Sequence, residues 1–200
     1  MSGANDGITG LVLAGGLGRR MGGVDKGLQA FRGEPMVAHV IRRLLPQVDT
    51  LMVNANQNIE RYGAFGHPVV PDAISGFAGP LAGLHAGLNA CTTPLLVTSP
   101  CDSPFLPLDL VARLRAALER DAADLAVAYT GDQAHPVFSL VRRHLLRGLT
   151  GFLDGGGRKV DLWYAALKVV HVAFDDQPDA FANINTLNEL AALSVRPEES

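Results

Sequence analysis

The segment 11–27 reads L-V-L-A-G-G-L-G-R-R-M-G-G-V-D-K-G and places cationic side chains among closely spaced glycines. Gly15 and Gly16 allow the backbone to turn sharply and to bring its N–H groups close to a ligand. Arg20 can bind phosphate oxygens through its planar guanidinium, and Lys26 supplies a mobile point charge. The segment therefore predicts a phosphate-binding loop.

The common phosphate-binding motifs fit this loop only in part. A dinucleotide-binding loop has the pattern G-x-G-x-x-G, but Met21 stands where the third glycine is required. A P-loop needs a lysine and a hydroxyl residue after its second glycine, whereas Val24 and Asp25 follow Gly23. A solvated turn between a strand and a helix would explain the glycines but not the cations.

A second candidate is Asp102, which lies in S-P-C-D-S-P-F directly after the apolar run 94–99. A carboxylate at the end of a buried strand suits Mg²⁺, which takes one or two carboxylates and fills its shell with water and phosphate oxygens. The alternative is that Asp102 caps a helix beginning near Leu106 or organises the turn. Both interpretations are open from the residues alone.

Alternating apolar runs and helical patterns predict the elements that position these side chains. Strands are expected at 8–14, 50–54, 68–71, 94–99, 124–129, 136–141 and 169–174. Helices are expected at 35–48, 80–90, 108–120, 142–153 and 186–193, and the state of 160–167 is open. This alternation predicts an α/β protein with a mostly parallel sheet.

In such a sheet, ligands bind beyond the carboxyl ends of the strands. Three polar loops are expected at that edge: after Ala14, around Asn54 and around Asp102. The expected helix 80–90 carries glycines four residues apart, at 79, 83 and 87, which indicates close packing on the sheet.

Length and composition predict one compact domain. The chain has 200 residues, of which 48% are hydrophobic, and we expect a single domain at 8–193 between flexible ends at 1–7 and 194–200. The formal net charge of −3 disfavours a nucleic-acid partner. Cys91 and Cys101 lack the spacing of a disulfide framework or zinc site, so two reduced thiols are expected. Without a signal-peptide pattern or an apolar run of roughly 18 residues, a cytoplasmic protein without membrane contact is expected.

Five stretches together carry a resemblance to a known family. The segment 13–26, L-A-G-G-x-G-x-R-M-G-G-x-D-K, resembles the nucleotidyltransferase loop of the molybdenum cofactor guanylyltransferases, the MobA family. The others are V-N-A-N at 53–56, G-P-L-A-G at 79–83, P-C-D-S-P at 100–104 and N-I-N-T at 183–186. The similarity spans residues 8–190 and implies a single-domain, three-layer Rossmann-like nucleotidyltransferase fold with helices on both faces of the sheet.

The resemblance implies transfer of GMP from GTP to molybdenum-loaded molybdopterin, with release of pyrophosphate and formation of the guanine dinucleotide cofactor. Two alternatives are open. One is a related nucleotidyltransferase that uses CTP with the same pterin or activates a sugar phosphate. The other is a GTP-binding accessory protein without chemistry of its own. Transient contacts with proteins of cofactor biosynthesis or molybdoenzyme maturation are also expected.

The resemblance also implies roles for residues around the nucleotide. The backbone of Leu13, Ala14, Gly15 and Gly16 would receive it, and Arg20 and Lys26 would hold its triphosphate. Asp102 would bind Mg²⁺, or Mn²⁺ in its place, so that Asp102, Lys26 and Arg20 form the catalytic set.

Further residues are implied at the two ends of the site. Asn54 and Asp72 would contact the nucleotide, and a carboxylate at position 72 could accept hydrogen bonds from the N1–H and N2–H groups of guanine. Asp72 as a plain turn residue is the alternative. Asn183, Asn185 and Arg158, or its neighbour Lys159, would face the incoming pterin phosphate.

Overall fold

The computed structural model describes residues 6–16, 25–74, 79–182 and 184. Several predictions of the sequence analysis lie outside the described residues: the site residues Arg20, Asn183 and Asn185, the helix 186–193 and the tail 194–200.

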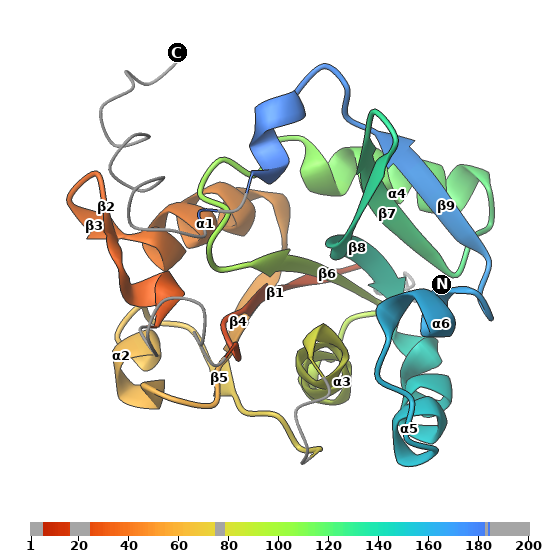
Figure 1. The fold of residues 1–200 in the computed structure, drawn as a ribbon, viewed down its shortest axis with the longest axis horizontal. Helices are drawn as coiled ribbons and strands as arrows, with labels where there is room; N and C mark the ends of the chain where they lie inside the picture. The colour runs from red at the N-terminus through yellow and green to blue at the C-terminus, as the bar shows by residue number, and fades with distance from the viewer. Residues whose placement is uncertain (1–5, 17–24, 75–78, 183, 185–200) are drawn as a thin grey trace, which may run out of the picture.

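A seven-stranded sheet runs through the middle of the protein in the order β5-β4-β1-β6-β8-β7-β9 (Figure 1). Its strands are β1 (Ile8–Leu13), β4 (Thr50–Asn54), β5 (Val69–Val70), β6 (Leu95–Pro100), β7 (Leu125–Thr130), β8 (Gln133–Arg142) and β9 (Val169–Ala173). Neighbouring strands are parallel except where β8 pairs antiparallel with both β6 and β7. The mostly parallel sheet is thus confirmed, with β8 as the one reversed strand among those described.

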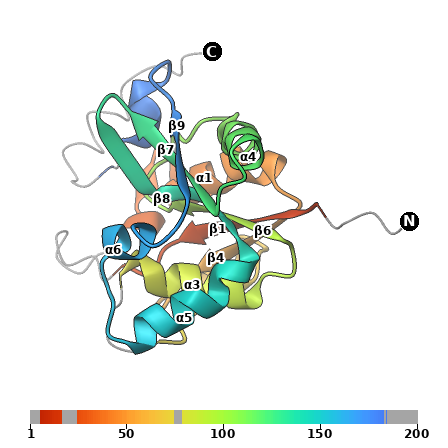
Figure 2. The ribbon, with the colours of Figure 1, turned by 90° about the vertical axis from the view of Figure 1, so that its right-hand side faces the viewer.

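Helices cover both faces of the sheet and form the three expected layers. Figure 2 shows α1 (Met36–Leu44) and α4 (Leu110–Arg120) on one side, with α3 (Pro80–Ala90) and α5 (Leu146–Asp154) on the other. Each side has its own cluster of buried apolar side chains, and β1 between them is buried except at Leu13, which is partly exposed. Among the described residues, no helix is both long enough and apolar enough to cross a bilayer.

The helix expected at 35–48 is shorter in the structure. Pro35 belongs to β3 (Glu34–Pro35), which forms a small hairpin with β2 (Ala30–Phe31), so the helix expected from residue 35 begins at Met36. It ends at Leu44, and the 3₁₀ turn η3 (Leu45–Gln47) follows. Pro46 lies in that turn and has no N–H group with which to continue the helix.

The helix expected at 142–153 is wrong at its start. Arg142 pairs with Leu95 as the last residue of β8, and the 3₁₀ turn η4 (Arg143–Leu145) separates it from α5. Pairing with β6 places Arg142 in the strand, although its local sequence pattern is equally compatible with a helix.

Several short elements were not expected from the sequence. They are the hairpin β2–β3, the helix α2 (Ile59–Gly63) and the 3₁₀ turns η2 (Lys26–Leu28) and η5 (Pro178–Phe181). The open segment 160–167 contains the short helix α6 (Val160–Tyr164). Elements of two to five residues are too short to establish a hydrophobic period.

Close packing of α3 on the sheet is confirmed at two of its three glycines. A Cβ atom on Gly87 would lie 2.4 Å from Cδ2 of Leu11 on β1, and one on Gly83 would lie 2.7 Å from Cδ2 of Leu13. Gly79 has another role, because a Cβ there would meet nothing within 4 Å but its φ of +60° favours glycine.

Candidate active site

Three neighbouring parallel strands end together and bring their loops side by side. Leu13 at the end of β1 pairs with Asn54 at the end of β4 and with Pro100 at the end of β6. Backbone hydrogen bonds continue beyond the strands, from Ala14 N to Asn54 O at 2.8 Å and from Cys101 N to Leu13 O at 3.0 Å. The three polar loops expected at this edge are therefore adjacent.

This arrangement changes the expectation for the backbone of the glycine loop. The N–H of Ala14 is already engaged with Asn54, so it does not face a nucleotide in this structure. Gly15 and Gly16 follow it and continue the chain beyond the strand. A Cβ on Gly16 would meet no atom of the described residues within 4 Å.

Lys26 and Asp102 converge from segments that are 76 residues apart. The Lys26 Nζ atom lies 3.2 Å from Oδ2 of Asp102, and the two side chains are 20% and 13% exposed. Lys26 begins the turn η2, and Asp102 follows β6. The two side chains therefore meet at the edge where they were expected, and both are partly exposed; their binding of a polyanion stays a prediction.

The alternative that Asp102 caps a helix is wrong. Helix α4 begins at Leu110, and Asp109 occupies its N-cap position. Asp102 instead lies in the loop between β6 and α4, where its backbone carbonyl accepts a hydrogen bond from Ile184 N at 3.0 Å.

Ile184, the one described residue of the N-I-N-T motif, lies beside this loop. Its side chain is buried with Phe31 and Met36, and Phe105 packs against them. Asn183 and Asn185 flank Ile184 but lie outside the described residues, so their role toward the pterin stays a prediction. The third residue of that group, Arg158, donates hydrogen bonds to the carbonyls of Leu153 and Gly157 at the end of α5.

Asp72 is held by two asparagines on the other side of β1. Asn54 Nδ2 donates to Asp72 Oδ1 at 2.8 Å and to Val70 O at 3.0 Å. Asn56 Nδ2 donates to Asp72 Oδ2 at 2.8 Å, while Asn56 Oδ1 accepts from Asp72 N at 2.8 Å. Because a carboxylate oxygen has more than one lone pair, Asp72 can still accept further hydrogen bonds from a ligand.

Two glycines leave space for the buried side chain of Asn54. A Cβ on Gly83 would lie 2.4 Å from Asn54 Oδ1, and one on Gly15 would lie 3.0 Å from the same atom. Asn54 is only 2% exposed. Gly83 therefore has a more specific role than the packing expected from the sequence, because it makes room for a residue of the candidate site.

The sequence analysis missed several polar residues at this edge. Asn56 lies within V-N-A-N and Asp25 precedes Lys26, so their motifs could have pointed to both. Tyr62 and Asn58, which bind Asp25, have no motif of their own. Only the folded chain brings them together.

The buried thiols are not candidates for nucleophilic chemistry. Cys91 and Cys101 are both free and buried, and burial raises the pKa of each thiol, so both are protonated at neutral pH. The expectation of two free thiols is confirmed.

The donor set at Asp102 is compatible with Mg²⁺. Asp102 offers one accessible carboxylate, and the part of the chain that the structure describes contains no group of three or more His, Cys, Asp or Glu side chains that could form a metal cage. Mg²⁺ needs only one or two protein carboxylates when phosphate oxygens complete its shell. A metal bound together with the nucleotide would fit these residues.

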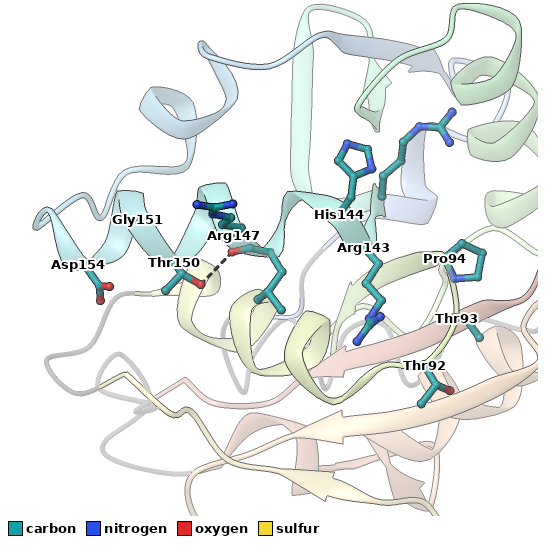
Figure 3. Close-up of a pocket in the computed structure, with 11 residues that line it drawn as sticks. Thr92, Thr93, Pro94, Arg143, His144, Arg147, Thr150, Gly151 and Asp154 are labelled. Atoms are coloured by element: carbon teal, nitrogen blue, oxygen red, sulfur yellow. Dashed lines mark hydrogen bonds between the residues drawn. The ribbon is translucent and has the colours of Figure 1, made fainter.

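A depression of about 1010 Å³ lies elsewhere, at the amino end of β6 (Figure 3). Its lining includes Thr92, Pro94 and Arg143, and Pro94 lies at the opposite end of β6 from Pro100. Arg143 and His144 point in opposite directions in Figure 3, so these two side chains do not converge on one ligand. This depression is separate from the candidate active site.

A family model described as the MobA-like NTP transferase domain matches residues 10–168. The chain belongs to this family. The match includes Lys26, Asp72 and Asp102, and it extends past β8.

Similar proteins cover nearly the whole chain. A protein from Cupriavidus taiwanensis named "Molybdenum cofactor guanylyltransferase" is 54% identical over 198 residues, which are 96% of this chain and 99% of that protein. One from Ralstonia nicotianae with the same name is 54% identical and covers 94% and 97% of the two chains. Among solved structures, the molybdopterin-guanine dinucleotide biosynthesis protein A of Archaeoglobus fulgidus has a TM-score of 0.77 at 22% identity, with 93% and 96% coverage. That structure supports the fold of this MobA-like protein.

Proposed function

We propose that this MobA-like protein transfers GMP from GTP to molybdenum-loaded molybdopterin and releases pyrophosphate. The convergence of Lys26 and Asp102 at the carboxyl edge of β1 and β6 is the structural observation that carries the proposal. The names of relatives that are 54% identical over nearly the whole chain support guanine as the base.

The chemistry requires charge stabilisation more than proton transfer. An oxygen of the terminal pterin phosphate attacks the α-phosphorus of GTP, and the bond from that phosphorus to the bridging oxygen of pyrophosphate breaks. The attacking phosphate is already ionised at neutral pH, so no strong general base is needed. The site must instead bring two anions together and stabilise the charge that moves onto pyrophosphate.

Each residue of the site has a role that fits its chemistry. Lys26 would hold phosphate oxygens with its ammonium group, and the backbone at Gly15 and Gly16 would allow the triphosphate to approach. Asp102 would hold Mg²⁺ or Mn²⁺, which would neutralise charge on the triphosphate when bound. Asn54 and Asp72 would contact the nucleoside, with the Asp72 carboxylate accepting from guanine N1–H and N2–H.

The proposal also includes three residues that lie outside the described part of the chain. Arg20 would join Lys26 at the triphosphate, and Asn183 and Asn185 would face the pterin phosphate. The hydrogen bond from Ile184 N to Asp102 O supports the latter placement, because Ile184 lies between the two asparagines in the sequence. Transient contacts with cofactor-biosynthesis or molybdoenzyme-maturation proteins stay a prediction.

The direct test is a transfer assay with purified protein, molybdenum-loaded molybdopterin and Mg²⁺. We expect release of pyrophosphate and formation of the guanine dinucleotide with GTP, little product with CTP or ATP, and loss of product when EDTA removes the metal. Equal or greater product with CTP would favour the cytidylyl alternative. GTP binding without product would favour the accessory-protein alternative.

A further inference from the structure

The position of Lys26 depends on how its neighbours in the chain are held. A lysine ammonium sits on a flexible four-carbon stem, so its location is defined only if the backbone beneath it is fixed. Asp25 and Gly27 stand on either side of Lys26 in the chain. Asp25 accepts a hydrogen bond from Tyr62 of α2, and Gly27 lies next to the same tyrosine side chain.

Asp25 is held by two neutral donors. Tyr62 Oη donates to Asp25 Oδ1 at 2.5 Å, and Asn58 Nδ2 donates to Asp25 Oδ2 at 2.9 Å. Tyr62 is fully buried, and burial raises the pKa of its hydroxyl, so that group remains protonated and can donate. Both carboxylate oxygens of Asp25 therefore have a partner on the same short segment of chain.

Gly27 places the following residue directly against the same tyrosine. A Cβ on Gly27 would lie 2.6 Å from Tyr62 Oη and 3.0 Å from Cys101 Sγ. A side chain at this position would displace either the hydroxyl that binds Asp25 or the residue that precedes Asp102. Glycine is therefore required for the turn to lie this close to both sides of the site.

Asn58 and Tyr62 form one structural unit. Asn58 has a φ of +51°, a conformation that asparagine tolerates better than most residues, and its carbonyl accepts a hydrogen bond from Tyr62 N at 3.0 Å. The two donors to Asp25 are thus fixed relative to each other by the start of α2. Lys26 then reaches Asp102 from a backbone that is held at both neighbours.

We propose that Tyr62 and Asn58 clamp Asp25 so that Lys26 is held at the phosphate-binding position beside Asp102. Tyr62, Asn58 and Asp25 are positioning residues in this proposal, since they act through Lys26 and do not touch the substrate. The proposal rests on the proposed function because it takes Lys26 as a ligand of the nucleotide phosphates.

The first test removes only the hydroxyl, with Tyr62→Phe. We expect GTP affinity in the presence of Mg²⁺, measured by calorimetry, to fall about tenfold, because a hydrogen bond to a charged group is lost. Tyr164→Phe is the matched control, since its hydroxyl donates to Pro136 O at 2.9 Å on another part of the sheet. That variant should lose stability without a change in GTP affinity. A Tyr62→Phe protein that melts at a lower temperature but binds GTP like the wild type would overturn the proposal.

Asn58→Gly tests the second arm of the clamp without straining the backbone, because glycine adopts a positive φ readily. Asn58 is exposed, so we expect a smaller loss of GTP affinity, about threefold. If the double variant Asn58→Gly/Tyr62→Phe binds GTP as tightly as the wild type, the proposed clamp is contradicted.

A double-mutant cycle shows whether Tyr62 acts through Lys26. In a Lys26→Met background, Tyr62→Phe should have almost no further effect on GTP affinity, because the group being positioned is absent. Additive losses would mean that the hydroxyl acts by another route and would refute the proposal. Guanylyl transfer by the wild-type protein is measured separately. If no transfer occurs but Tyr62 and Lys26 are still coupled in GTP binding, the proposed function is wrong and the positioning of Lys26 by Tyr62 is still supported.

Discussion

The two regions that flank β1 at its carboxyl end both contain an aspartate, but they hold it in different ways. On the β4 side, Asp72 accepts hydrogen bonds from the side-chain amides of Asn54 and Asn56. On the β6 side, Asp102 faces the ammonium group of Lys26. Neutral amides fix the orientation of a carboxylate and leave its charge uncompensated, whereas a flexible cation compensates the charge and can move to another anion.

Under the proposed function, this difference would separate base recognition from phosphate and metal chemistry. In the amide-held region, Asn54 is buried and fits between Gly15 and Gly83, so its side chain is held in one place. Such a region suits the reading of a flat base by hydrogen bonds in fixed directions. The region at Asp102 suits phosphate and metal binding, since its charges can be shared with a ligand.

Asp102→Asn should have the largest effect on transfer. The substitution keeps the size of the side chain but removes the charge that we assign to metal binding, and loss of one preorganised charge stabiliser costs about 10²–10³ in turnover. We expect kcat for pyrophosphate release to fall by at least about 10² while the circular dichroism spectrum is unchanged. Turnover like that of the wild type at saturating Mg²⁺ would remove Asp102 from the mechanism.

Lys26→Met should have the next largest effect, mainly on nucleotide affinity. The variant keeps the apolar stem and removes the ammonium, and a hydrogen bond to a charged group is worth about 1.5–3 kcal/mol. Calorimetric titration should show the dissociation constant for GTP rising by about 10- to 100-fold. An unchanged constant would argue against a phosphate role for Lys26.

Asp72→Asn should have a moderate effect that shows mainly in base selection. An asparagine has only one oxygen and would place an N–H₂ group against one of the two amide donors that now bind Asp72. We expect kcat/KM with GTP to fall by about 5- to 30-fold and the preference for GTP over ATP to narrow. If kcat falls as far as in Asp102→Asn with the same preference for GTP, the distinction between the two regions is wrong.

Gly83→Ala should have the smallest effect on turnover, and the added methyl group would act on Asn54 and on Leu13. The added methyl group would displace Asn54 Oδ1, and overpacking of this kind costs about 1–3 kcal/mol of unfolding free energy. Urea unfolding should show this loss together with a raised KM for GTP. Gly151→Ala in α5 is the matched control, because a Cβ there meets no atom of the described residues within 4 Å. That change should stabilise the protein by about 0.5–1 kcal/mol. If both substitutions lower the free energy of unfolding, the effect at Gly83 comes from replacing a helical glycine and not from the displacement of Asn54.

The outline of the fold was predictable because its signals are local. Apolar runs and helical spacing identified β1, β4, β6, α3 and α4 within about two residues. The start of α5 was missed because pairing with β6 decides that Arg142 is in a strand. The short elements β2, β3 and α2 were missed because they show no measurable period.

The candidate site was predictable only as far as its motifs reach. Lys26 and Asp102 each lie in a motif, and the rule that ligands bind at the carboxyl edge was sufficient to place them together. No motif identifies Tyr62, whose proposed role is inferred from its contact with Asp25. The space that Gly83 leaves for Asn54 was equally hidden, because a pattern of small residues indicates packing without naming the partner.

The sequence by itself determined the family, the alternation of strands and helices, and the edge of the sheet at which glycines, a lysine and an aspartate gather. The tertiary structure alone decided which partner each carboxylate has: amides for Asp72, an ammonium for Asp102, and a tyrosine and an asparagine for Asp25. The physical reason is that strand order and helix packing set the distances between residues far apart in the chain. Hydrogen bonds depend on those distances, which local spacing does not contain.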